Sequence, residues 1–230
     1  MSTTVAETKT ALRDAPTLEE VGALDVVDAE KMLSSATFPL DAATLIKLTK
    51  EYLATSNGVE KPEIVAEDFK FVAPIIGPLG KKEFLKAFAS FKLKDAFPDA
   101  KGNFYGFSVD PFEPNRVWFM SRFTATHTGR LMQIKPTGKV VESPPQIGSC
   151  TWNAEGQCTK LTAGYVMDRQ EGNTGGLGGV FGILYAIGSP FPFPECRPYK
   201  KSWQFRLFGF VTSLMQKLGE FFAKKEDKTA

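Results

Sequence analysis

Residues 68–91 constrain the fold of this chain more than any other part of the sequence. Residues 69–74 suit an extended strand, and the glycines and prolines that follow as far as Gly80 end it. A helix is predicted from Lys81, because apolar side chains recur at helical spacing on one face: Phe84, Leu85, Phe88 and Phe91. A strand, a tight connection and an amphipathic helix are therefore expected here.

Further helices are predicted before this segment and strands after it. Thr17 and Asp41 are expected helix N-caps, the second for a helix that runs to about Thr55. Residues 62–68 are expected to form a short helix. Strands are expected at 104–109, 117–128, 147–152 and 161–167. Helices followed by a run of strands favour an α+β fold over alternating βαβ units.

Net charge and composition restrict the kinds of partner that this chain of 230 residues is expected to bind. A net charge of +2 argues against nucleic acid. Twenty phenylalanines indicate a wide pocket, an apolar partner surface or simply a core rich in phenylalanine. The beginning of the sequence has no apolar run typical of a secretory signal, so we expect an intracellular protein, in the cytoplasm or an organelle stroma. Cys150 and Cys158 flank an expected turn, and whether they pair is left open.

Four motifs together resemble the SnoaL-like branch of the NTF2-like superfamily. They are residues 68–91, THTG at 126–129, PTGK at 136–139 and Asp168 after the last expected strand. The resemblance implies a cone in which a curved, mostly antiparallel sheet and its helices surround one pocket. Residues 38–190 would form this domain. Residues 1–37 would then be a partly helical extension, and residues 191–230 an extension with an amphipathic helix.

Asp168 is the first candidate for catalysis. It follows an apolar strand, where a partly desolvated carboxylate is suited to donate and accept protons near neutral pH. In SnoaL-like cyclases the corresponding aspartate is the general acid/base, so the resemblance implies that role here. The alternative is a carboxylate that caps the following turn.

His127 is the second candidate, because an imidazole titrates near neutral pH. It would act as an acid or base at the pocket rim, or else be an ordinary hydrogen-bonded histidine at a loop edge. Since it is the only histidine of the chain, a site with several histidine ligands is excluded. No metal and no cofactor is expected.

Substrate-binding side chains are expected on the strand at 117–128. Its even positions share one face and include Trp118, Arg122 and Thr124. Arg122 would bind an anionic or carbonyl group, or else form a salt bridge at the surface. Gln146, on the neighbouring strand, is a further candidate.

Two segments near the C-terminus carry patterns of their own. The glycine-rich run at 175–182 lacks the spacing of a nucleotide-binding motif and fits close packing of a short helix. Within residues 203–222, apolar side chains recur at helical spacing and would form a stripe along one side of a helix. Residues 197–230 carry eight basic and three acidic side chains. We expect Leu207, Val211, Leu214 and Leu218 to be buried against the domain or a homodimer partner. A peripheral membrane or protein contact is the alternative.

The function expected is that of a SnoaL-like small-molecule enzyme or binder. It would use cofactor-independent acid/base chemistry on an apolar or carbonyl-containing ligand, in a cyclisation, isomerisation or dehydration. The alternative is a non-catalytic module for ligand binding or protein interaction, because one fold hosts both kinds of protein.

Overall fold

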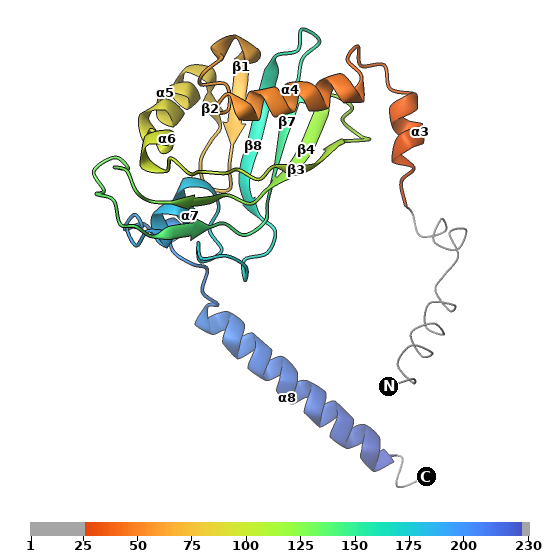
Figure 1. Cartoon of the computed structure of the whole chain (residues 1–230). Coiled ribbons are helices and arrows are strands. Elements are labelled where there is room, and N and C mark those ends of the chain that lie inside the picture. Colours follow the sequence, from red (N-terminus) through yellow and green to blue (C-terminus); the bar gives the residue numbers. More distant parts are fainter. Residues whose placement is uncertain (1–25, 227–230) are drawn as a thin grey trace, which may run out of the picture.

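The computed structural model describes residues 26–226 of the chain, and its side chains as far as residue 218. The helix expected from Thr17 begins outside the described residues. A curved sheet packed with helices forms the upper part of the molecule in Figure 1. The predicted α+β fold class is thereby confirmed.

Six strands form the main sheet in the order β2-β1-β8-β7-β4-β3. Their bounds are Leu79–Gly80 (β2), Val65–Val72 (β1), Cys158–Val166 (β8), Gln146–Trp152 (β7), Arg116–Ser121 (β4) and Tyr105–Val109 (β3). Strands β1 and β8 pair in parallel, and every other neighbouring pair is antiparallel. A separate antiparallel pair consists of β5 (Thr124–Thr126) and β6 (Val140–Glu142).

The α-helices of the described residues are α3 (Ala29–Ser34), α4 (Ala42–Ala54), α5 (Lys81–Phe91), α6 (Leu93–Ala96), α7 (Gly179–Ala186) and α8 (Trp203–Glu226). Short 3-10 helices occupy Pro62–Ile64 and Pro194–Cys196. The expected N-cap of α4 is confirmed, because Asp41 Oδ1 accepts a 2.7 Å hydrogen bond from the Thr44 N–H. The helix expected at 62–68 is wrong beyond Ile64, since the chain enters β1 at Val65 and pairs with Cys158.

Helix α4 lies across the sheet (Figure 1) and is fixed to it by buried aromatic side chains. The indole N–H of Trp152 donates a 3.0 Å hydrogen bond to Thr49 Oγ1. The rings of Tyr52 and Trp152 meet edge to face, with their centroids 6.2 Å apart. All three side chains are fully buried, so this contact joins the helix to β7.

Helix α5 is fixed to β1 by a cluster of phenylalanines. The Phe84 ring is fully buried, with its centroid 5.0 Å from that of Phe69 and 5.1 Å from that of Phe71. The Phe88 ring lies 4.2 Å from Phe84 on the next turn of the helix. The strand, connection and helix predicted for residues 68–91 are confirmed, and these rings hold them together.

The single strand expected at 117–128 is wrong, because it breaks after Ser121. Ser121 still pairs with Gln146 of β7, whereas the backbone after it bonds to a different segment. The Arg122 N–H donates to the Gly102 carbonyl, and Thr124 exchanges backbone hydrogen bonds with Lys101. The chain therefore leaves the main sheet and continues as β5 in the small sheet.

Two smaller expectations concern cysteines and glycines. Cys150, Cys158 and Cys196 are free, buried thiols, so the pairing left open above is not formed. The glycine-rich run leads into α7, where close packing is confirmed. A Cβ on Gly178 would lie 2.0 Å from the Gly164 carbonyl oxygen of β8.

Helix α8 projects away from the domain (Figure 1). Every described side chain from Trp203 to Leu218 is exposed. The expectation that Leu207, Val211, Leu214 and Leu218 are buried against the domain is therefore wrong. Their exposed fractions are 44–52%.

Replacement of Phe84 by alanine should be severely destabilising. Removing a fully buried ring leaves a cavity in the cluster, so Phe84→Ala should lower the free energy of unfolding by about 3–5 kcal/mol. Urea denaturation followed by tryptophan fluorescence measures the loss. The matched control is Phe112→Ala, since the Phe112 side chain is 70% exposed. Equal effects of the two substitutions would contradict the assignment of Phe84 to the core.

Candidate functional site

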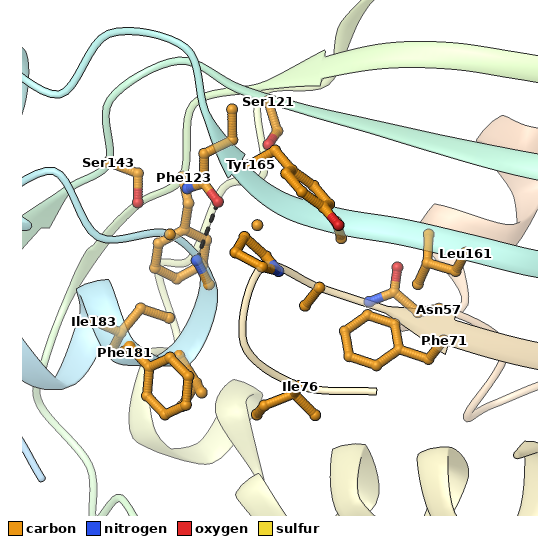
Figure 2. A pocket seen from close by; sticks show the side chains of 18 of the residues that line it. Asn57, Phe71, Ile76, Ser121, Phe123, Ser143, Leu161, Tyr165, Phe181 and Ile183 are labelled. Atoms are coloured by element: carbon orange, nitrogen blue, oxygen red, sulfur yellow. Dashed lines mark hydrogen bonds between the residues drawn. The ribbon is translucent and has the colours of Figure 1, made fainter. Parts of the chain in front are cut away.

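A cavity of about 620 Å³ lies between the sheet, α5 and α7 (Figure 2). Side chains from distant parts of the sequence converge on it, including Phe71 of β1, Leu161 of β8 and Phe181 of α7. Most of its lining is aromatic or aliphatic. The aromatic side chains are Phe71, Phe88, Phe91, Phe104, Phe119, Phe123, Tyr165 and Phe181.

The cavity continues the apolar face of the sheet. Phe119, Ser121 and Phe123 line it from β4 and the residues just after it. These are the odd positions of the segment, the same face on which Val117 enters the core. Ala87 and Phe88 line the cavity from the second half of α5, which the buried Phe84 holds against β1. One face thus provides both the core and the cavity wall.

The polar side chains of the lining are few and uncharged: Asn57, Ser121, Ser143, Gln146 and Tyr165. Among the described lining residues there is no Asp, Glu, His, Lys or Arg. Neutral donors and acceptors in an apolar wall can orient a ligand by hydrogen bonds, and they offer no counter-charge to an ion.

Gln146 joins the sheet to the wall formed by α7. Its side-chain oxygen accepts a 3.0 Å hydrogen bond from the Gly179 N–H (dashed line in Figure 2). Because the oxygen is engaged in this way, the side-chain NH₂ is the group left to donate to a ligand. The close approach of Gly178 to Gly164 brings α7 to this position, since a side chain there would clash with the β8 backbone.

Asp168 lies outside the lining of the cavity, contrary to the expectation. Its side chain is exposed just after β8, and Oδ1 accepts a 2.9 Å hydrogen bond from the Gln170 N–H. This is the turn-capping alternative. The chain turns outward after Val166, so the carboxylate follows the last strand without facing the cavity.

His127 also lies outside the cavity lining, and it is fully buried rather than at a pocket rim. Its ring lies 5.1 Å from that of Phe97, centroid to centroid. Nδ1 lies 3.0 Å from Thr137 Oγ1 and accepts a 3.3 Å hydrogen bond from the Thr137 N–H. The proton of the neutral ring is therefore on Nε2, for which the described residues provide no hydrogen-bond partner. Burial lowers the pKa of His127.

The even-numbered face of the strand segment points away from the cavity. The Trp118 indole N–H donates to Asp110 Oδ2 at 2.7 Å, and the Arg116 guanidinium lies 4.6 Å from the Trp118 ring. Arg122 forms a 2.8 Å ion pair with Glu171, the surface alternative. Thr124 Oγ1 accepts a hydrogen bond from the Asn103 side chain. The expected placement of Trp118, Arg122 and Thr124 in the pocket is wrong.

Of the six predicted site residues, Gln146 alone lines the cavity. Four polar residues of the lining were not predicted: Asn57, Ser121, Ser143 and Tyr165. A signal for Ser121 was present, because it interrupts the apolar odd positions of its strand between two phenylalanines. Asn57 and Ser143 lie in connections, where periodicity carries no information on direction.

Within the part of the chain that the structure describes, no three His, Cys, Asp or Glu side chains lie close enough together to hold one metal ion. The site is thus defined by its shape, its apolar wall and five neutral polar side chains.

Neither a protein-family model nor a curated protein sequence matches this chain. Solved structures resemble it. A protein from Jannaschia sp. CCS1, assigned as a SnoaL-like polyketide cyclase, is 13% identical over 68% of this chain and 97% of that chain, with a TM-score of 0.47. AclR from Streptomyces galilaeus, assigned as a hydroxylase, is 17% identical over 67% and 91%, with a TM-score of 0.48. SnoaL-like proteins, expected from the motifs, are thus found among the structural neighbours, and none of these likenesses carries an activity to this chain.

The buried His127 should make stability fall in mild acid. The unfolded chain takes up the histidine proton below about pH 6.5, whereas the folded chain, with the lowered pKa, takes it up only at lower pH. Stability is therefore complete above about pH 6.5 and decreases as the pH falls from there toward the folded pKa.

Urea denaturation at about pH 7.5 and about pH 5.5 measures this decrease. Its comparison with His127→Gln separates the histidine from the carboxylates, which are common to both proteins. The variant should lose less stability than the parent chain over this interval. An equal loss in both would show that His127 makes no contribution.

Proposed function

We propose that this protein binds an uncharged, mostly apolar small molecule that carries a carbonyl or similar acceptor group. The observation that supports it most directly is the cavity of about 620 Å³ with its wall of phenylalanine and aliphatic side chains. That volume falls within the range of about 300–1,000 Å³ usual for ligand sites, which bury most of a ligand behind apolar walls. Burial of the ligand's apolar surface would provide most of the affinity.

The neutral lining supports an uncharged ligand. An ion that entered this cavity would lose its hydration without gaining a counter-charge from the described lining residues. Hydroxyl and amide groups, in contrast, suit a single carbonyl or hydroxyl. The NH₂ of Gln146 and the hydroxyl of Tyr165 are the donors that we assign to such a group.

Binding is supported better than acid/base turnover. A cyclisation, isomerisation or dehydration needs a group that moves a proton beside the reacting atom. Tyr165 is the one ionisable side chain among the described residues of the lining. Asp168 and His127, the two residues expected to move protons, are separate from that lining.

Filling the cavity should strongly weaken ligand binding. Ala87 lines the cavity from α5, so Ala87→Trp places an indole in the ligand's space. The uncharged probe N-phenyl-1-naphthylamine should gain fluorescence with the parent chain and bind at least about tenfold more weakly to this variant. Ala43→Trp makes the same change at an exposed position of α4 and should bind normally. Unaltered binding to a folded Ala87→Trp variant would contradict the proposal.

The assigned polar contact has its own test. Tyr165→Phe removes one hydroxyl and keeps the ring, so it should weaken binding of the naphthyl ketone prodan by about three- to tenfold. Binding of N-phenyl-1-naphthylamine, which has no carbonyl, should be unchanged and serves as the control. If the two probes are affected equally, Tyr165 contributes packing and not a hydrogen bond.

A further inference from the structure

Helix α8 presents an apolar face that nothing in the described part of the chain covers. The helix runs from Trp203 to Glu226 and projects from the domain (Figure 1). The exposed fraction is 70% for Trp203, 67% for Phe210 and 68% for Met215. So many exposed large apolar side chains on one element mark an interaction surface.

The apolar side chains occupy one side of the helix. At 3.6 residues per turn, those between positions 203 and 218 fall within an arc of about 160° that only Gln204 interrupts. The members of this apolar arc are Trp203, Leu207, Phe208, Phe210, Val211, Leu214, Met215 and Leu218. Phe205 is the one large apolar side chain outside it, and Lys201 Nζ lies 5.6 Å from its ring centroid.

Positive charge borders the apolar arc. Arg206 and Lys217 are eleven positions apart, close to three full turns, so both lie along the same edge of the arc. Arg197, Lys200 and Lys201 precede the helix, and residues 197–219 contain no acidic side chain. Basic side chains in this position can reach outward to anionic headgroups while the apolar arc is buried.

The width of the arc and the place of Lys217 argue against pairing with a second copy of α8. In the heptad pattern set by Trp203, Leu207, Phe210 and Leu214, position 217 is the next seam position, and it is a lysine. An arc of about 160° is also wider than the narrow seam of a two-stranded coiled coil. A broad apolar side with basic edges is typical of a helix that lies in a membrane surface.

Two further features fit a membrane surface. No helix of the described residues is long and apolar enough to cross a membrane. Tyr199, just before α8, and Trp203, its first residue, are exposed by 79% and 70%. Tyrosine and tryptophan side chains favour the boundary between headgroups and acyl chains. We infer that α8 lies in the plane of a membrane surface that contains anionic lipid, with its apolar arc toward the acyl chains.

Co-sedimentation of the full chain with vesicles tests this inference. The chain should sediment with phosphatidylcholine vesicles that contain phosphatidylserine, much less with phosphatidylcholine alone, and less as salt is raised. Leu207→Gln with Leu214→Gln should abolish sedimentation. The control, Thr212→Gln with Ser213→Gln, makes the same kind of change on the opposite side and should sediment normally.

The charge contribution is tested separately. Arg206→Gln with Lys217→Gln should lower the partition coefficient by at least about tenfold, because each basic side chain near an anionic surface adds to the attraction. Lys82→Gln with Lys86→Gln removes the same charge from exposed positions on α5 and should have little effect. Because every substituted side chain is exposed, all four variants should unfold at the temperature of the parent chain.

Three outcomes would overturn the inference. One is that the parent chain sediments with neither kind of vesicle. Another is that Leu207→Gln with Leu214→Gln sediments as well as its control. The third is that the parent chain does not bind vesicles but forms a concentration-dependent dimer that Leu207→Gln with Leu214→Gln abolishes. That result would show that a second copy of the chain covers the apolar arc. Probe binding in the cavity is measured without vesicles, so the two proposals fail independently.

Discussion

The contact of Phe84 with the rings of β1 is the interaction on which the site depends. Phe84 is the buried end of an aromatic series that continues through Phe88 to Phe91 on the same side of α5. The first ring belongs wholly to the core, and the later two border the cavity. The core and the cavity wall therefore belong to one continuous apolar layer. Side chains fill the space at the end near Phe84, and the space at the other end is the cavity. A change that tilts α5 would alter the volume of the cavity as well as the stability of the domain.

Local features of the sequence predicted several elements well. The cap at Asp41 and the apolar spacing after Lys81 each depend on neighbours within a few residues, and both helices are found where expected. The break after Ser121 was not predictable in this way, because residues 116–126 have β-forming side chains on both sides of it. The break depends on hydrogen bonds to residues 101–103, which no local pattern reveals.

The site was harder to predict than the fold for a physical reason. Charged and titratable residues are the usual candidates for a functional site when only the sequence is known. In this chain two of them, Arg122 and Asp168, lie at the surface, where water solvates them. The side chains that line the cavity are apolar or neutral, so they look like core residues in the sequence. What separates cavity from core is whether the opposing element fills the space. That depends on where α7 lies, which the contacts of Gly178 and Gln146 determine.

The parallel pairing of β1 with β8 has a consequence for synthesis on the ribosome. Strand β1 ends at Val72, and its central partner β8 begins only at Cys158. The chain between them must be made before the sheet can close, and such long-range pairing is slow. The wall formed by α7 follows later still. Until then, α5 and β1 form a phenylalanine-rich part of the nascent chain in which the edge of β1 that faces β8 is unpaired. An unpaired strand edge beside exposed apolar side chains favours aggregation and binding by chaperones.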